Sequence, residues 1–424
     1  MTTVAEELDT KVAAAKSASR GLARLPTVVK NRALLNVADG LGAHQAEILR
    51  ANEEDYREAR ASGLSESLLD RTLLNSERLE AMAADVRKIA DLPDPVGETF
   101  DERVLPNGLR VGKRRVPLGV IAAVYESRPN VTIDISSLCL KSGNAIVLRG
   151  GKEAFHSNKA LVGIVRNGVA EAGAPEEAVQ FVESTDRELV GRMLQMSGSI
   201  DLVVPRGGAG LIRFIVENAT MPVLAGGIGV CHTYLDSSAD FDMAREIVYN
   251  AKVQRPSVCN ALDTVLIHQA IAEEALPDVA RALARAGVEL RCDPAALAIL
   301  REAGLDDVKE AVQDDWGMEF LDLIAAVKVV DSLDDAVEHI ERYGSGHSEA
   351  IITSDYAAAN QFMDRVDAAA VYVNASTRFT DGAEFGLGAE VGISTQKFHA
   401  RGPMGLREMT SYKWTIFGDG QARP

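Results

Sequence analysis

The stretch Gly119-Val-Ile-Ala-Ala-Val-Tyr125 decides the fold class. It is apolar throughout, without alternation of polar and apolar side chains, as is typical of a strand buried on both faces of a parallel sheet. A helix is expected over about 132–142, and it should end at Gly143, because glycine readily takes the left-handed conformation after a helix. The next apolar run, Ala145-Ile-Val-Leu-Arg149, predicts a second strand. These residues therefore begin an α/β unit.

The same alternation continues along the chain. A helix over about 154–171, a strand over 179–182, a helix near 187–196 and a strand over 200–204 are expected in turn. Strands that alternate with helices predict a parallel sheet with right-handed crossovers, which is a doubly wound domain. Ligands of such domains bind beyond the carboxyl ends of the strands.

The flanking regions have different patterns. Residues 1 to about 90 have apolar residues at helical spacing and almost no strand signal. Residues from about 227 to 400 predict a second αβ region, with strands such as Thr264–Ile267 and Val371–Asn374. The tail Thr410–Phe417 is rich in β-forming residues, and such an edge strand pairs either within its own domain or with another chain.

Composition excludes several classes of protein. The chain has 424 residues, which predicts two or three domains, and its 45 basic and 62 acidic residues give a net charge of −17. This charge repels nucleic acid and anionic lipid, so we expect neither as a partner. The four cysteines have no CxxC spacing and the seven histidines form no HExxH motif, so no metal is expected. An acidic N-terminal stretch without an apolar segment predicts no secretion signal and a cytoplasmic protein.

Three glycines lie in Pro205-Arg-Gly-Gly-Ala-Gly210, between a predicted strand and a predicted helix. Gly207, Gly208 and Gly210 could let backbone amides approach a phosphate at the positive end of the helix. An ordinary turn between strand and helix explains the same glycines equally well. Both interpretations stay open at this point, because no GxGxxG motif follows the first strand.

Cys259 lies in the polar sequence Gln254-Arg-Pro-Ser-Val-Cys-Asn260. Most cysteines are small buried hydrophobic residues, and Cys139 and Cys231 fit that description. Cys259 differs because a proline, polar residues and Arg255 surround it, and a nearby cation raises the fraction of reactive thiolate. A catalytic and a structural role therefore both remain open.

Asn130 follows the first strand at its carboxyl end, in Tyr125-Glu-Ser-Arg-Pro-Asn130. Its amide could donate a hydrogen bond to an oxyanion, and the loss of one such donor typically costs about 2.7–4 kcal/mol of transition-state stabilisation. Asparagine is equally favoured as the N-cap of a helix.

A family resemblance joins these residues. Pro117-Leu-Gly-Val120, Asn130, Leu224-Ala-Gly-Gly-Ile-Gly229, Cys259, Glu319-Phe320 and Val373-Asn374 resemble, in this order, the aldehyde dehydrogenase superfamily. Within the superfamily, the stretches Gln254–Asn260, His339-Ile-Glu-Arg-Tyr-Gly-Ser-Gly-His-Ser-Glu349 and Gly402–Trp414 are similar to the γ-glutamyl phosphate reductases, also called glutamate-5-semialdehyde dehydrogenases.

The resemblance implies an architecture and an assembly. It implies an aldehyde-dehydrogenase-like α/β fold with a doubly wound cofactor domain (1–105 and 121–226), an αβ catalytic domain (227–404) and a small β oligomerisation extension (106–120 and 405–424). In the superfamily this extension completes a sheet in a partner subunit. We therefore expect a homodimer or a homotetramer.

The resemblance also implies roles for single residues. Cys259 falls at the nucleophile, Asn130 at the oxyanion donor and Glu319 at the glutamate that binds the nicotinamide ribose. Arg149 and Lys152 fall near the adenosine site, where a cation suits the 2′-phosphate of NADPH. On charge and position alone, the candidates for holding the anionic substrate are Arg128, Arg255, Arg378 and His399.

One departure from the superfamily pattern bears on the reaction. Hydrolytic members carry a glutamate before Gly226-Gly227, as the general base that activates water, whereas Val223, Leu224 and Ala225 stand here. Without a general base, which contributes about 10²–10⁴ in rate, a thioester on Cys259 is protected from water. The expected reaction is the NADPH-dependent reduction of γ-glutamyl phosphate to glutamate 5-semialdehyde in proline biosynthesis, with the glutamate kinase that makes this labile substrate as a candidate partner. The alternative is an aldehyde dehydrogenase that oxidises a small aldehyde, and NADH remains open as the cofactor.

Overall fold

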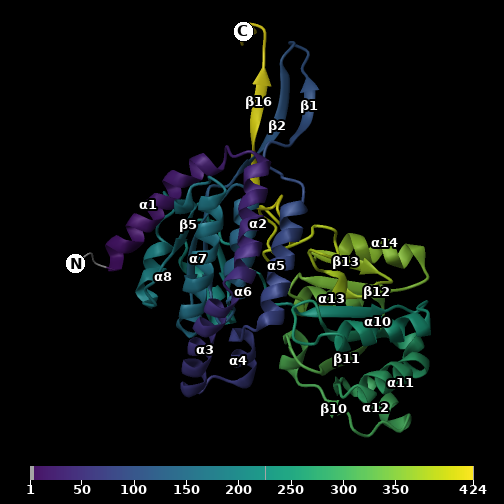
Figure 1. Cartoon of the computed structure of the whole chain (residues 1–424). Coiled ribbons are helices and arrows are strands. Elements are labelled where there is room, and N and C mark those ends of the chain that lie inside the picture. The colour runs from purple at the N-terminus through teal and green to yellow at the C-terminus, as the bar shows by residue number, and fades with distance from the viewer. Residues whose placement is uncertain (1–3, 225, 424) are drawn as a thin grey trace. The chain divides into compact units, whose positions relative to one another are not determined.

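The structure is a computed structural model that describes residues 4–224 and 226–423 and separates into two compact units. Unit 1 comprises the described residues up to 224 together with 386–391 and 404–423. Unit 2 comprises residues 226–385 and 392–403. Figure 1 shows the elements along the chain. Within the described residues, no helix combines the length and the apolar character that crossing a bilayer requires.

The elements of unit 1 are α1 (Val4–Leu22), α2 (Thr27–Ala43), α3 (Gln45–Ala61), α4 (Glu66–Thr72), α5 (Ser76–Asp91), β1 (Thr99–Val104), β2 (Arg110–Pro117), β3 (Val120–Tyr125), α6 (Asn130–Lys141), β4 (Ala145–Gly150), η1 (Lys152–Ala154), α7 (Phe155–Glu171), η2 (Glu176–Ala178), β5 (Val179–Phe181), α8 (Arg187–Met193), β6 (Leu202–Arg206), α9 (Ala209–Asn218) and β16 (Thr410–Phe417).

The elements of unit 2 are β7 (Cys231–Leu235), α10 (Phe241–Val253), β8 (Leu262–His268), α11 (Gln269–Arg285), β9 (Glu289–Cys292), α12 (Pro294–Glu302), β10 (Lys309–Glu310), η3 (Gln313–Gly317), β11 (Ile324–Val330), α13 (Leu333–Tyr343), β12 (Ser348–Ile352), α14 (Tyr356–Arg365), β13 (Ala370–Val373), η4 (Thr377–Phe379), β14 (Ile393–Ser394) and β15 (Gly402–Pro403).

The larger sheet of unit 1 is parallel and has the strand order β5-β4-β3-β6. Every residue of β3 is buried, because helices cover both faces of the sheet, and the uniformly apolar sequence of this strand is thereby explained. The doubly wound α/β fold predicted from the sequence is confirmed. The chain runs from β3 to β4 and β5 on one side and then returns to β6 on the other side of β3. Such a reversal places the loops after β3 and β6 next to each other, where ligands bind in this class of fold.

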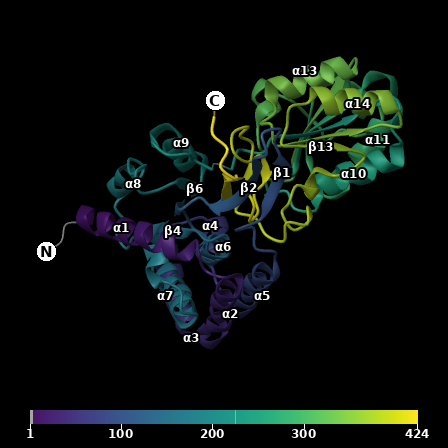
Figure 2. The same cartoon turned by 90° about the horizontal axis from the view of Figure 1, so that it is seen from above.

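The helices of unit 1 form two layers. α6 and α7 lie against the sheet, and α2 packs on both of them, with α5 beside α2 and α6 (Figure 2). The predicted end of α6 is confirmed, since Gly143 has a φ of +77° directly after the cap residue. A side chain at Gly143 would also collide with Pro117, 2.8 Å from the position of a Cβ. The helix expected over 187–196 is shorter and ends at Met193.

A second sheet of unit 1 is antiparallel and has the order β1-β2-β16. The tail strand β16 pairs with β2 along its whole length, from Thr410 opposite Pro117 to Phe417 opposite Arg110. Its pairing within its own chain leaves β1 and β16 as the two edges. The predicted domain boundary at residue 105 differs from this arrangement, because Thr99–Val104 belongs to the three-stranded sheet. Residues 386–391, assigned to the catalytic domain from the sequence, belong to unit 1.

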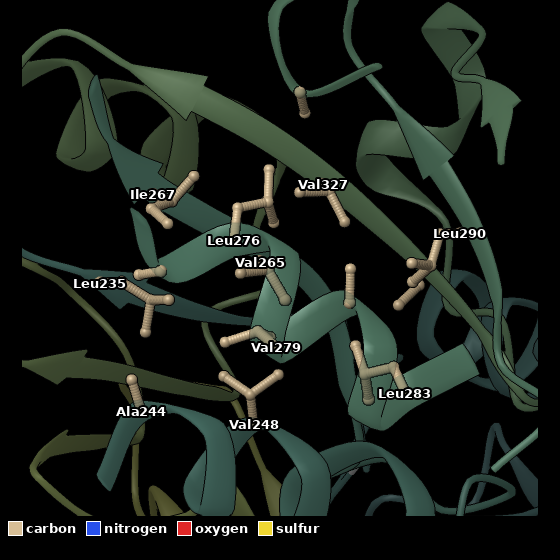
Figure 3. Packing of buried hydrophobic residues seen from close by; sticks show 14 of the residues in the cluster. Leu235, Ala244, Val248, Val265, Ile267, Leu276, Val279, Leu283, Leu290 and Val327 are labelled. Atoms are coloured by element: carbon tan, nitrogen blue, oxygen red, sulfur yellow. The ribbon is translucent and has the colours of Figure 1, made fainter. Parts of the chain in front are cut away.

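The sheet of unit 2 has the order β10-β9-β11-β8-β7-β12-β13, and its strand pairs are parallel. Its two faces can be followed along β8. Val265 and Ile267 pack in one hydrophobic core, whereas Leu266, between them, packs in another on the opposite face. α10, α11 and α12 supply the first core, which Figure 3 shows, and α13 and α14 supply the second.

The first core of unit 2 permits a matched test. Val279 lies on α11 and is 2% exposed, whereas Val312 is 61% exposed. Val279→Ala should lower the free energy of unfolding by about 2–3 kcal/mol, because it removes buried methyl groups and leaves a cavity. Val312→Ala should change it by less than about 0.5 kcal/mol. Urea denaturation of both variants measures the difference, and equal effects would contradict this account of the core.

Candidate active site

The loops after β3 and β6 are joined by hydrogen bonds at the carboxyl edge of the sheet in unit 1. The amide of Glu126 donates to the carbonyl of Arg206 at 2.9 Å, and a carboxylate oxygen of Glu126 accepts from the amide of Gly208 at 3.3 Å. A Cβ on Gly207 would lie 2.6 Å from that oxygen. A side chain at Gly207 would therefore displace the Glu126 carboxylate. The carboxylate engages one of the amides that a phosphate was expected to use.

The other glycines of this loop face open space. A Cβ added to Gly208 or to Gly210 would meet no heavy atom within 4 Å. The helix α9, which starts directly after Gly208, presents its N-terminus there. An anion could therefore approach this end of the helix, with Glu126 beside it.

Arg149 and Lys152 lie at the end of the neighbouring strand β4. Arg149 is 7% exposed and donates through Nη2 to the carbonyl of Thr185 at 2.8 Å, while its Nε has no hydrogen-bond partner among the described residues. Burial lowers the pKa of Arg149, and the carboxylates of Glu153 and Glu126 oppose this effect. Lys152 is exposed at the start of η1. A buried cation with an unused donor fits the phosphorylated ribose that the resemblance places here.

Asn130 is the first residue of α6 rather than its N-cap, because Pro129 occupies the cap position. The alternative reading of Asn130 as an N-cap is therefore wrong. Its amide nitrogen donates to Asp134, one turn later, at 2.9 Å. This hydrogen bond orients the side-chain amide of Asn130 so that its nitrogen faces Asp134. Burial raises the pKa of Asp134 to about 6, while Asn130 and Arg206 favour the ionised form. Arg128 lies half-buried in the loop before α6.

Cys259 lies in unit 2, between α10 and β8, and is half-buried. The backbone of Gly229 lies against its backbone, since a Cβ on Gly229 would stand 1.7 Å from the carbonyl oxygen of Cys259. Cys231, two residues later, donates through its Sγ to the same carbonyl oxygen at 3.2 Å. Burial raises the pKa of Cys231 well above its usual value, so this thiol stays protonated. The segment before β7 thus fixes the position of the Cys259 backbone.

Glu319 reaches the same segment. Its carboxylate accepts a hydrogen bond from the amide of Gly229 at 3.0 Å. Burial raises the pKa of Glu319, and the bond from Gly229 partly offsets this effect. The structure therefore brings the predicted ribose-binding glutamate and the predicted nucleophile to opposite sides of one glycine.

The residue after Cys259 is held by η4 and its flanks. Asn260 is buried, and its amide nitrogen donates to the carbonyl of Thr380 at 2.9 Å. The hydroxyl of Thr377 donates to the carbonyl of Asn260 at 2.8 Å. The two peptides that follow Cys259 are therefore both held in place.

Two guanidinium groups belong to the same surroundings. Arg378, in η4, donates through Nε to the side chain of Gln254 at 2.8 Å. Burial lowers the pKa of Arg378, the charge of Arg255 lowers it further, and the charges of Asp381 and Cys259 oppose this. Arg255 and Arg378 therefore repel each other, and an anion between them would relieve the repulsion. The positive charge of Arg378 also stabilises the thiolate of Cys259.

His399 is the fourth substrate candidate. It is exposed, with a φ of +74°, in the segment between Lys397 and Arg401, which both form ion pairs with Asp367. Its role as a substrate-binding residue stays a prediction.

The described residues bring one group of possible metal ligands together, Glu54, Glu58 and His156, with ligand atoms within 4.8 Å of one another. The two glutamates are exposed and one turn apart on α3, far along the chain from the predicted catalytic residues.

Sequence reasoning overlooked several residues of the site. Glu126, Asp134 and Gln254 were not singled out, although each stands within four residues of a residue that was. The spacing of Asn130 and Asp134, one helical turn apart, could have predicted their contact. Ala225, one of the residues before Gly226 that replace the general base, lies outside the described residues, and Leu224 is buried.

Comparison with known proteins agrees with this arrangement. The sequence profile of the Aldehyde dehydrogenase family matches residues 2–316 and 323–415. A protein named gamma-glutamyl phosphate reductase from Dehalococcoides mccartyi (strain CBDB1) is 58% identical over 417 residues, which are 98% of each chain. The chain belongs to the aldehyde dehydrogenase family, among the gamma-glutamyl phosphate reductases.

Further relatives carry the same name. A gamma-glutamyl phosphate reductase from Caldanaerobacter subterraneus subsp. tengcongensis is 53% identical over 98% of this chain and 100% of its own. The crystal structure of gamma-glutamyl phosphate reductase from Thermotoga maritima is 48% identical, covers 99% of this chain and 100% of its own, and superposes with a TM-score of 0.95. The family resemblance and the fold predicted from the sequence are confirmed.

The buried carboxylate of Asp134 predicts a pH dependence of stability. Its pKa is about 6 in the folded protein, against about 4 for an unfolded aspartate, so the native state binds the proton more tightly. This group therefore costs stability as the pH rises from 4 to 6, by up to about 3 kcal/mol. Asp134→Asn removes the titration. The free energy of unfolding of the variant, relative to wild type, should increase between pH 4 and pH 7. Urea denaturation across this range measures it, and parallel pH curves would disprove it.

Proposed function

We propose that this protein reduces γ-glutamyl phosphate to glutamate 5-semialdehyde and phosphate, with Cys259 as the covalent nucleophile and NADPH as the reductant, in proline biosynthesis. The relatives named gamma-glutamyl phosphate reductase support the reaction. The observation that carries the assignment of residues is the position of Cys259, with a glycine backbone packed against it and a guanidinium that interacts with its charge.

The first step is the attack of the Cys259 thiolate on the carbonyl carbon of the acyl phosphate. Arg378 supports this step, because a nearby positive charge increases the thiolate fraction of the thiol. A new C–S bond forms and the carbonyl oxygen becomes an oxyanion. The amide of Cys259 and the side-chain amide of Asn130 are the proposed donors to this oxygen, and Asp134 orients the amide of Asn130.

The oxyanion then collapses, the C–O bond to phosphate breaks, and a thioester remains on Cys259. Phosphate leaves with at least two negative charges, which suits a pair of guanidinium groups that repel each other when no anion is between them. Arg255 and Arg378 form such a pair, and we propose that they bind the leaving phosphate. Arg128 and His399 remain candidates for the rest of the anionic substrate.

The thioester must be reduced by hydride rather than hydrolysed by water. The residues before Gly226 include no carboxylate, so no general base is provided at the position where hydrolytic relatives carry one. When bound, the nicotinamide supplies a hydride to the thioester carbon, and the resulting thiohemiacetal expels the Cys259 thiolate to give the aldehyde.

The residues proposed to hold the cofactor are Arg149, Lys152, Gly208 and Glu319. Arg149 and Lys152 would meet the 2′-phosphate and adenosine, and the open N-terminus of α9 at Gly208 would meet the diphosphate. The buried Arg149 Nε, which lacks a partner among the described residues, supports a ligand there. Glu319 would bind the nicotinamide ribose. A reducing cytoplasm suits the four cysteines, all of which are thiols in the structure, and a glutamate kinase is a proposed partner that supplies the labile substrate.

The reaction can be tested in reverse. Wild-type protein given glutamate semialdehyde and NADP should reduce the nucleotide only when phosphate or arsenate is present, because water cannot release the thioester. Cys259→Ala should lower turnover more than a thousandfold while binding of the nucleotide, measured by fluorescence titration, is kept. The forward assay with NADH in place of NADPH measures nucleotide preference. Steady turnover in phosphate-free buffer would instead indicate a hydrolytic aldehyde dehydrogenase.

The three-stranded sheet of unit 1 supports an assembly of identical subunits. Its edge strand β16 carries large exposed apolar side chains, Trp414, Ile416 and Phe417, which are 49%, 56% and 59% exposed. An edge strand with an apolar surface invites pairing with another chain unless it is covered. We propose a homodimer or a homotetramer in which this sheet forms the contact (Figure 1).

A matched pair of substitutions tests this assembly. Ile416→Glu should shift the mass measured by light scattering toward that of a monomer, because it places a charge on the proposed contact. Val28→Glu is the control, since Val28 is exposed to a similar extent, 61%, but lies on α2. A monomeric wild type, or an Ile416→Glu variant of unchanged mass, would exclude this contact.

A further inference from the structure

Four consecutive backbone amides, those of residues 229–232, donate to four side-chain oxygens. The amide of Gly229 donates to Glu319 at 3.0 Å and that of Val230 to the hydroxyl of Ser345 at 2.9 Å. The amide of Cys231 donates to Asp263 at 3.3 Å, and that of His232 to Glu349 at 2.8 Å. We call residues 229–232 the amide segment. A strand ordinarily satisfies its amides through its neighbours, so four side-chain acceptors in succession are unusual for the start of a strand.

The sheet explains why side chains are needed here. The pairing of β7 with β8 is irregular at its first residues, since the register shifts between Cys231 and His232. Buried amides that lose their strand partners must find other acceptors. The amide segment is therefore held in place by side chains from four other parts of unit 2.

The amide segment in turn fixes the nucleophile. It touches the backbone of Cys259 at Gly229, where a Cβ would lie 1.7 Å from the carbonyl oxygen, and at Cys231, whose Sγ donates to that oxygen at 3.2 Å. A displacement of the amide segment would therefore change its contacts with the Cys259 carbonyl.

Two of the four acceptors belong to His339–Glu349, one of the stretches that resemble the γ-glutamyl phosphate reductases, which has no role in the proposed reaction. Ser345 bonds Val230 twice, since it accepts from the amide at 2.9 Å and donates to the carbonyl at 3.3 Å. Ser348 of the same stretch shares a hydrogen bond of 2.6 Å with Thr380, whose carbonyl holds Asn260. The stretch therefore contacts both the amide segment and Thr380, which hold the Cys259 carbonyl and Asn260.

We propose that Ser345 is a positioning residue for Cys259, which acts through Val230 and Gly229 and touches neither substrate nor cofactor. Its importance for catalysis rests on the proposed function, whereas its effect on the thiol does not. Among the four acceptors, Ser345 is the best for a test. It is half-buried in a loop, so its replacement is mild, whereas Glu349 is fully buried against His232.

The experiment measures the rate at which iodoacetamide alkylates Cys259, by peptide mass spectrometry of the full chain at pH 7. Iodoacetamide reacts with the thiolate, which Arg378 stabilises. In Ser345→Ala the displaced thiol should lose part of this stabilisation, and alkylation should slow at least fivefold. Ser345→Thr keeps the hydroxyl and should react within twofold of wild type. The matched control is Ser332→Ala, which removes the serine cap at the other end of α13 and should also leave the rate within twofold.

Reductase assays on the same variants add a second measurement. In Ser345→Ala, kcat should fall tenfold or more, whereas KM for the nucleotide should change less, because Glu319 is the only proposed cofactor residue that contacts the amide segment. Alkylation of Ser345→Ala within twofold of wild type would overturn the proposal. Equal slowing in Ser332→Ala, or in Ser345→Thr, would also overturn it, because general loosening would then explain the loss. If alkylation responds as expected but the wild type lacks reductase activity, the positioning role stands and the proposed function fails.

Discussion

One tight contact in unit 2 lies between two stretches of backbone. Gly229 lies against Cys259 so closely that any side chain at residue 229 would overlap the carbonyl oxygen of Cys259. The contact requires glycine for lack of space rather than for backbone conformation. Other features of the site depend on it: Glu319 reaches the same glycine, Cys231 bonds the same carbonyl, and Asn260 is held from the far side by Thr380. The backbone of the proposed nucleophile is therefore held in place, while residue Cys259 as a whole is half-buried.

The electrostatics of the protein operate on two length scales. The whole chain carries a net charge of −17, which disfavours the approach of an anionic substrate over long distances. Near Cys259, in contrast, the local charge is positive because of Arg255 and Arg378. In unit 1 the position of Glu126 at the amide of Gly208 adds negative charge where a diphosphate is expected. Binding there would require the carboxylate to turn away, and the free amide would then be available to the ligand.

Much of the fold followed from short-range patterns. The uniformly apolar β3, the glycine after α6 and the alternation of strands and helices were sufficient to predict the doubly wound sheet. The limits of the three-stranded sheet could not be predicted from such patterns. Thr99–Val104 is largely polar and becomes a strand only through its pairing with β2. In the site, Cys259 and Asn130 stood out by their local sequence. The bond from Val230 to Ser345 joins residues 115 positions apart, and no local pattern encodes such a pair.

The acceptors of the amide segment have a consequence for the order of biosynthesis. Cys259 is translated well before Ser345, Glu349 and Thr380, which hold its surroundings. A nascent chain that has been synthesised only to residue 330 contains Cys259 but none of these three residues. The geometry around the thiol is therefore completed only after β12 has joined the sheet beside β7. A chain that stops short of this point lacks residues that hold the surroundings of Cys259, so its thiol should react as an ordinary cysteine does.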